Sequence, residues 1–137
     1  MDYVLNTRMT VSGIRWAKGT VNGVNGVILL PDNWSSSFYT INDANGGTYG
    51  SNIISADDWA SLLEPKGVVF LPYTGGIRRG TANAESTSGA YLLSTWGRNN
   101  GSNRYVWQYG FNSTAEGVSA QALTYDGRAV RLARDLQ

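Results

Sequence analysis

Two short apolar runs, each opened by glycine and closed by proline, constrain the fold of this chain more than any other feature. They are GVILLP at residues 26–31 and GVVFLP at residues 67–72. A continuous apolar run of this length, bounded by turn-forming residues, is typical of a strand that is buried on both faces. The repeated pattern predicts two similar central strands in one core, and not a duplicated domain.

The segment before the first run carries turn signals and the end of a helix. Two Asn-Gly pairs, at residues 22–23 and 25–26, give the strongest short signal for a tight turn, and residues 14–17 are expected to form a short strand ahead of them. Residues 2–8 are typical of a helix end, with Arg8 near the C-terminal side of the dipole. Because a domain seldom opens in mid-helix, we expect a domain truncated at its N-terminus.

A polar segment and a second short helix lie between the two apolar runs. Residues 32–52 are rich in Ser, Asn and Gly, which predicts a long loop. Ser55 and Asp58 have the spacing of a variant capping box, so a helix is expected to begin there and to end at Pro65. The side chains expected to face the core follow the helical period: Trp59, Leu62 and Leu63.

The C-terminal part reads as strands and turns. The expected strands cover residues 89–95, 105–111, 118–123 and 128–134. Helices first and an antiparallel group of strands last predict an α+β fold within a single domain of residues 1–137. In the second strand one face carries aromatic side chains, for which we expect core packing, with a stacking platform as the alternative: Tyr105, Trp107, Tyr109 and Phe111. The opposite face, with Val106 and Gln108, would then be displayed.

The composition excludes several classes of function. The chain has no Cys and no His, which rules out disulfides, Cys-His and Ser-His-Asp hydrolases and the usual zinc sites. The net charge of +1, without a basic stripe, argues against nucleic-acid binding, and no apolar stretch reaches the length of a membrane span. We expect neither a metal nor a cofactor.

What remains favours a recognition surface. Only 15% of the residues are charged, while eight Tyr, five Trp and many Ser, Asn and Gly residues are present. Tyr and Trp offer large contact areas with few rotatable bonds, and Ser, Gly and Asn supply adaptable hydrogen bonds, as in antibody paratopes. A protein with many turns would consume Gly and Asn in the same way, so the composition alone leaves both interpretations open.

Several segments, in order, resemble a known family. They are VNGVNG at residues 21–26, LLPDNW at residues 29–34, VFLP at residues 69–72 and DGRAVRL at residues 126–132, with Ser94-Thr95 after a Gly-x-Tyr opening. Together they are similar to the major paralogous domain of Fibrobacter and Bacteroides-group surface proteins. That family also resembles the variable proteins of diversity-generating retroelements, which are often phage-borne.

The resemblance covers nearly the whole chain and implies a C-type-lectin-like fold, with two short helices packed on antiparallel strands. It also implies a position on a phage virion or a bacterial cell surface, and diversity concentrated ahead of a constant final strand. The match is loose between Trp96 and Tyr125. A calcium-dependent sugar site is not expected, because Glu64-Pro65-Lys66 lacks the amide of the usual motif and no Trp-Asn-Asp triplet is present.

The first hypothesis is therefore a non-catalytic, receptor- or adhesin-like domain that binds a protein or glycan target on a cell or particle. We expect a loop at residues 96–104, rich in hot-spot residue types, to carry much of the site, although a plain solvated hairpin loop is the alternative. The expected ligand-binding residues are Trp96, Arg98, Asn99, Asn100, Ser102, Asn103, Arg104, Val106, Gln108, Ser119, Gln121, Thr124 and Tyr125. The alternatives are a structural or assembly module of a surface appendage, and a carboxylate glycosidase, for which no pair of acids stands out.

Overall fold

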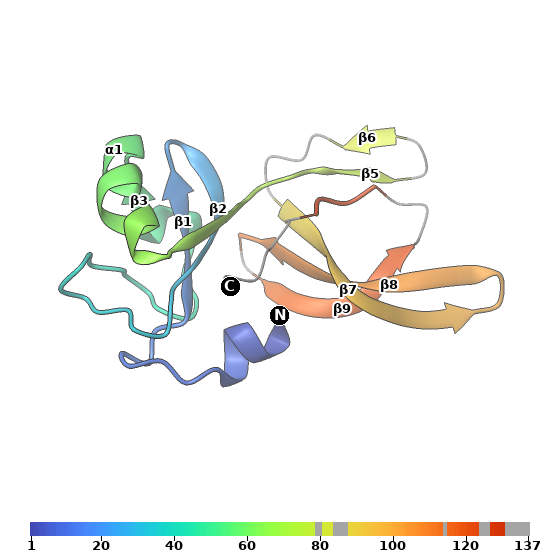
Figure 1. Cartoon of the computed structure of the whole chain (residues 1–137). Helices are drawn as coiled ribbons and strands as arrows, with labels where there is room; N and C mark the ends of the chain where they lie inside the picture. The colour runs from blue at the N-terminus through green and yellow to red at the C-terminus, as the bar shows by residue number, and fades with distance from the viewer. Residues whose placement is uncertain (79–80, 84–87, 114, 124–126, 131–137) are drawn as a thin grey trace. The chain divides into compact units, whose positions relative to one another are not determined.

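The computed structural model describes residues 1–78, 81–83, 88–113, 115–123 and 127–130. The chain forms two compact units, Met1–Tyr73 and Thr74–Gln137, and we describe each by itself. Short helical segments accompany sheets of mostly antiparallel strands (Figure 1). The expected α+β class is confirmed.

The first unit is built on a four-stranded sheet. Its strands, in spatial order, are β3 (Ile53–Ile54), β1 (Trp16–Val21), β2 (Val24–Leu29) and β4 (Val69–Pro72). The two proline-closed runs pair with each other in antiparallel register, so that Val27 lies opposite Leu71. Because β2 lies inside the sheet and β4 ends it, the expectation of two central strands is correct only for the first run.

The first Asn-Gly pair forms the turn of the β1–β2 hairpin. Asn22 and Gly23 have φ angles of 50° and 77°, as a type I′ turn requires at its two central positions. The second pair, Asn25 and Gly26, lies inside β2, so the turn expected there is wrong. The short strand expected at residues 14–17 begins two residues later and is longer, because the hairpin register extends it to Val21.

Gly26 is fixed by packing and not by a turn. A Cβ atom built at this position would lie 2.5 and 2.6 Å from two ring carbons of Phe70, and closer still to the carbonyl oxygen of Leu71. Glycine therefore allows β4 to lie close against β2 while the Phe70 ring crosses the strand.

The second helix is continuous but irregular. It runs through α1 (Ala56–Asp58), the π-helical η3 (Trp59–Leu63) and the 3₁₀ turn η4 (Glu64–Lys66). Ser55 caps it as expected, since its hydroxyl accepts a hydrogen bond from the backbone N–H of Asp58 at 3.0 Å. The helix ends at Gly67, whose φ of 82° forms a left-handed cap, and not at Pro65, which sits in the first turn of η4.

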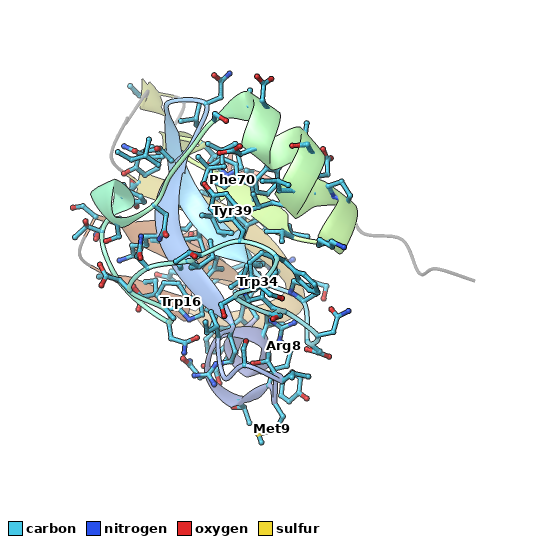
Figure 2. All side chains as sticks on the ribbon, turned by 90° about the vertical axis from the view of Figure 1, so that its left-hand side faces the viewer. Arg8, Met9, Trp16, Trp34, Tyr39 and Phe70 are labelled. Carbon is cyan, nitrogen blue, oxygen red and sulfur yellow. The ribbon has the colours of Figure 1, made fainter. Side chains whose placement is uncertain are left out.

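The core of the first unit lies between this helix, the sheet and the long loop. Leu63 is fully buried and Trp59 is half-buried, whereas Leu62 is 41% exposed, so its expected place in the core is wrong. The irregular hydrogen bonding of η3 departs from the 3.6-residue period on which that expectation relied. The loop at residues 32–52, as expected, is largely without regular structure apart from η2 (Tyr49–Ser51), and it contributes the buried Trp34 (Figure 2).

One buried amide organises the same loop. The side-chain N–H₂ of Asn52 donates to the carbonyl oxygens of Lys18 and Asn42, at 2.8 and 3.0 Å, and its oxygen accepts from the backbone N–H of Asn42 at 2.8 Å. Asn52 is 4% exposed. This side chain therefore ties the loop to the central strand of the sheet.

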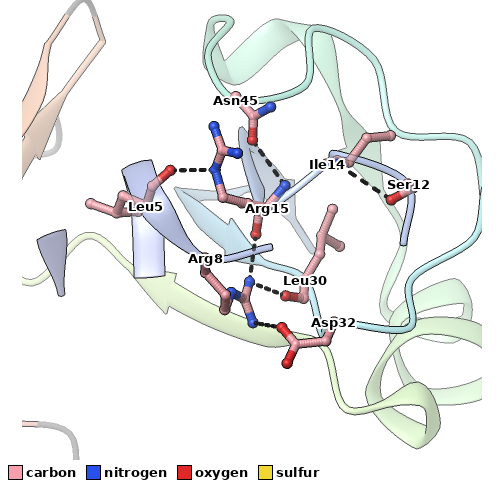
Figure 3. Close-up of polar contacts among 8 residues, drawn as sticks. All are labelled: Leu5, Arg8, Ser12, Ile14, Arg15, Leu30, Asp32 and Asn45. Atoms are coloured by element: carbon pink, nitrogen blue, oxygen red, sulfur yellow. Dashed lines mark hydrogen bonds and ion pairs between the residues drawn. The ribbon is translucent and has the colours of Figure 1, made fainter. Parts of the chain in front are cut away.

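Polar contacts also hold the N-terminal helix η1 (Tyr3–Thr7), which matches the helix end expected at residues 2–8. The Arg8 guanidinium pairs with Asp32 at 3.1 Å and donates to the carbonyl oxygens of Arg15 and Leu30 (Figure 3). Arg15 in turn donates to the carbonyl oxygen of Leu5 at 2.7 Å. The two arginines thus satisfy backbone carbonyls at the ends of η1, β1 and β2.

The second unit contains a two-stranded and a three-stranded sheet. The small sheet pairs β5 (Gly76–Arg78) with β6 (Thr81–Asn83), and the larger one has the order β7 (Ser88–Asn100), β8 (Asn103–Asn112) and β9 (Glu116–Leu123). All three expected strands are present here and are longer than expected. Of the strand expected at residues 128–134, Ala129 forms a parallel bridge to Tyr91, and residues 131–134 lie outside the described residues.

Candidate ligand-binding site

The three-stranded sheet of the second unit carries the candidate site, and its two faces differ sharply. On one face Tyr109 is fully buried and Phe111 is 4% exposed. The ring of Phe111 lies 5.5 Å from that of Tyr109 and stacks at 6.3 Å on that of Tyr91. The expected core packing of the aromatic row is therefore correct for Tyr109 and Phe111, while Tyr105 and Trp107 are only half-buried.

Glycine on the neighbouring strand makes room for the aromatic face. Gly89 pairs directly with Phe111, and a Cβ atom at Gly89 would lie 2.8 and 2.9 Å from two carbons of that ring. Burial raises the pKa of the Tyr109 phenol well above its usual range, and the negative charge of Glu116 raises it further. This face is a packed core with a neutral tyrosine in it.

The opposite face is lined by small residues. Gly110 on β8 pairs with Ala90 on β7 and with Gly117 on β9, so three small residues lie side by side across the sheet. A Cβ atom at Gly117 would meet no other atom within 4 Å, and one at Gly110 would meet only the carbonyl oxygen of Gly89, at 3.9 Å. These glycines leave open space where Gly26 and Gly89 accommodate rings.

The segment after β9 adds a cationic side chain to this face. Ala129 donates to the carbonyl oxygen of Ala90 at 3.2 Å and accepts from the N–H of Leu92 at 2.9 Å. These bonds form the parallel bridge to Tyr91. Since side chains alternate along a strand, Arg128 lies on the same face as Ala90.

Together these residues form a pocket of about 400 Å³ at the end of the sheet away from the β7–β8 turn. The three small residues floor it, and polar side chains surround them. The lining comprises Ser88, Gly89, Ala90, Gln108, Gly110, Phe111, Asn112, Ala115, Glu116, Gly117 and Arg128.

Gln108 is the polar group in this pocket with an unmet hydrogen-bonding requirement. Its side-chain oxygen Oε1 is buried, and no group in the described part of the chain donates to it. Asn112, in contrast, uses its side-chain oxygen to accept from the backbone N–H of Ala115 at 2.7 Å, which closes the β8–β9 turn. A buried amide oxygen without a donor costs about 1–3 kcal/mol, which a ligand N–H or O–H would offset.

The segment expected as a loop at residues 96–104 is the end of a hairpin. β7 continues through Asn100, β8 begins at Asn103, and Gly101 and Ser102 form the turn, with Gly101 at a φ of 59°. Pairing between the strands explains this difference, because the polar side chains of this segment show no alternation that would predict strands. Of the expected site residues at this tip, the structure shows three to be exposed: Asn99, Ser102 and Arg104.

The remaining expected site residues lie further along the same sheet. Val106 pairs with Trp96 on β7, and Gln108 pairs with Ser119 on β9. Val106 and Gln108 are half-buried, so the face expected to be displayed is only partly so. The structure describes only the backbone of Trp96, Arg98, Asn100, Asn103, Ser119 and Gln121, and both Thr124 and Tyr125 lie outside the described residues.

Sequence reasoning placed Gln108 in the site but missed the rest of the pocket. Ser88, Asn112, Glu116 and Arg128 were not expected to contribute. One signal was present in the sequence: glycine at position 110, within a strand rich in aromatic residues, marks a close approach or an open space. The partners of Gly110 could not be named, because they depend on the strand register.

Comparisons with known proteins do not place the chain in a family. No family model, no curated protein and no solved structure matches it. No helix in the described part of the chain is long and apolar enough to cross a membrane. Nor do the described residues bring three acidic side chains together as a metal site would need.

Proposed function

We propose that this chain is a non-catalytic ligand-binding domain, whose recognition surface is the three-stranded sheet of the second unit. The observation that carries the proposal is the pocket floored by Ala90, Gly110 and Gly117, with the buried acceptor of Gln108 at its side. A concave site with a few convergent polar groups is the usual form of a ligand-binding site.

The hairpin tip supports the same proposal. Asn99 pairs with Arg104 across β7 and β8, and both residues are exposed beside the two-residue turn. Arginine and asparagine are frequent in recognition surfaces, and a rigid hairpin presents them with little loss of conformational entropy on binding. The sheet would therefore offer a pocket at one end and a polar tip at the other.

The family resemblance extends the proposal to a scaffold and a location. We propose a C-type-lectin-like domain that serves as the variable protein of a diversity-generating retroelement, on a phage virion or a bacterial cell surface. Sequencing the gene across its source population tests this part directly. Substitutions concentrated between Leu92 and Tyr125, with residues 128–132 constant, would support it, and uniform sparse substitution would refute it.

Binding is tested with the purified chain on arrays of bacterial surface proteins and glycans. Ser102→Trp obstructs the hairpin tip and Gly110→Val fills the pocket, while Ser36→Trp places the same bulky residue at an exposed position of the first unit. We expect capture of a target by the unmodified chain and by Ser36→Trp, and loss of capture in one or both sheet variants. Capture that neither sheet variant weakens would refute the sheet as the recognition surface. Self-association without any captured target would favour the assembly module instead.

A further inference from the structure

We propose that the pocket of the three-stranded sheet binds a neutral, hydroxyl-rich ligand of saccharide size. This inference rests on the proposed binding function and adds the chemical class of the ligand. It is drawn from the charge, the hydrogen-bonding groups and the floor of the pocket.

The charges of the pocket favour a neutral ligand. Its lining contains one cationic side chain, Arg128, and one anionic side chain, Glu116. A ligand with a full charge would meet one attractive and one repulsive partner within the same small volume, and it would also lose hydration on entering. A neutral polar ligand avoids both costs and can bond to each of the two groups.

The hydrogen-bonding groups require a ligand that both donates and accepts. Gln108 Oε1 needs a donor, whereas the guanidinium of Arg128 can only donate. Ser88 and Asn112 carry groups that do both. A hydroxyl group donates and accepts at one atom, so a ring with several hydroxyls can satisfy partners of both kinds at the edge of the pocket.

The floor suits the flat side of such a ring. Ala90, Gly110 and Gly117 offer a shallow surface of one methyl group and backbone CH₂ groups. A saccharide ring presents C–H groups on its faces and hydroxyls around its edge, so its face can lie on this floor while its edge reaches Gln108. The volume of about 400 Å³ accommodates one ring with room for a second, and it falls within the roughly 300–1,000 Å³ of small-molecule sites.

Titration calorimetry and ligand-observed NMR with defined sugars test the inference. The neutral probes are glucose, galactose and mannose, and the charged probes of equal ring size are glucuronate and glucosamine. We expect at least one neutral sugar to bind in the millimolar range and both charged sugars to bind about tenfold more weakly. No binding by any neutral sugar, or preference for a charged one, would overturn the inference.

Variants locate the binding. Gln108→Leu removes the acceptor and should weaken sugar binding about tenfold, and Gly110→Val should abolish it by filling the floor. Ser36→Trp should leave it unchanged. Circular dichroism checks that each variant folds, and Gly117→Val fills the same floor from β9 if Gly110→Val does not fold. Sugar binding that survives both fillings would place it elsewhere and overturn the inference.

The two proposals fail in different ways. A chain that captures an array target, loses it in Ser102→Trp and yet binds no neutral sugar would retain the binding function and refute the ligand class. A chain that captures no target and binds no sugar would refute both proposals.

Discussion

Alanine at position 26 provides the sharpest test of the packing in the first unit. A Cβ atom there would lie 2.5 and 2.6 Å from two carbons of the Phe70 ring, and it would approach the carbonyl oxygen of Leu71 more closely still. Real Cβ atoms essentially never come within 3.0 Å of another such atom. The ring can rotate away, but the carbonyl belongs to the backbone of β4, so β4 must move outward and loosen its pairing with β2.

The expected cost follows from these contacts. Overpacking in a core typically costs about 1–3 kcal/mol, and a displaced backbone places this case at the upper end. The lower entropy of the unfolded alanine variant returns about 0.4–1 kcal/mol. We therefore expect Gly26→Ala to lower the free energy of unfolding by about 2 kcal/mol, equivalent to a fall of about 8 °C in Tm for a chain of this length.

Gly110→Ala is the matched control, since its Cβ would meet only the carbonyl oxygen of Gly89, at 3.9 Å. Its free energy of unfolding should be unchanged or higher by up to about 1 kcal/mol. Urea unfolding followed by tryptophan fluorescence measures both variants, with unchanged m-values as the check on two-state behaviour. Equal losses in the two variants, or no loss in Gly26→Ala, would refute the packing of β4 against Gly26.

Two further variants test single buried groups. Asn52→Ala removes three hydrogen bonds and leaves the carbonyl oxygens of Lys18 and Asn42 without their partner, so thermal unfolding should show a loss of about 3 kcal/mol, and a loss below about 1 kcal/mol would contradict this role. Tyr109→Phe removes a buried hydroxyl that has no hydrogen-bond partner among the described residues, and should raise stability by about 1 kcal/mol at neutral pH. Because burial, aided by Glu116, raises the pKa of Tyr109, the folded chain holds this proton more tightly than the unfolded one. Stability should thus be constant below the ordinary tyrosine pKa of about 10 and fall as the pH rises above it. Urea midpoints should show a shallower alkaline fall in Tyr109→Phe, and equal slopes would refute the raised pKa.

Local signals in the sequence predicted the parts of the fold that local chemistry decides. The turn at residues 22–23 and the cap at Ser55 depend on a few neighbouring residues and are found as expected. Errors arose where packing decides the outcome. The Asn-Gly pair at residues 25–26 has the composition of a turn but lies in a strand, because the ring of Phe70 needs the space at that glycine.

The candidate site was only partly predictable for the same reason. Gln108 could be placed by alternation along one strand, which is a local argument. The pocket around it depends on Ala90, Gly110 and Gly117, which come from three strands and meet only through the register of the sheet. Arg128 joins them through a parallel bridge formed by a single residue, for which no local pattern exists.

Glycine connects the two kinds of result, because the same residue type has opposite meanings at different positions of this chain. At Gly26 and Gly89 the missing side chain is replaced by an aromatic ring, so that adding a methyl group must displace that ring. At Gly110 and Gly117 nothing fills the space, so that a methyl group costs little and a strand without a side chain forgoes packing and conformational stability. A position that could be made more stable by one methyl group, and yet floors a polar pocket, is typical of a site where binding has been favoured over stability. The opposite responses of Gly26→Ala and Gly110→Ala would therefore separate the glycines that build the scaffold from those that keep the pocket open.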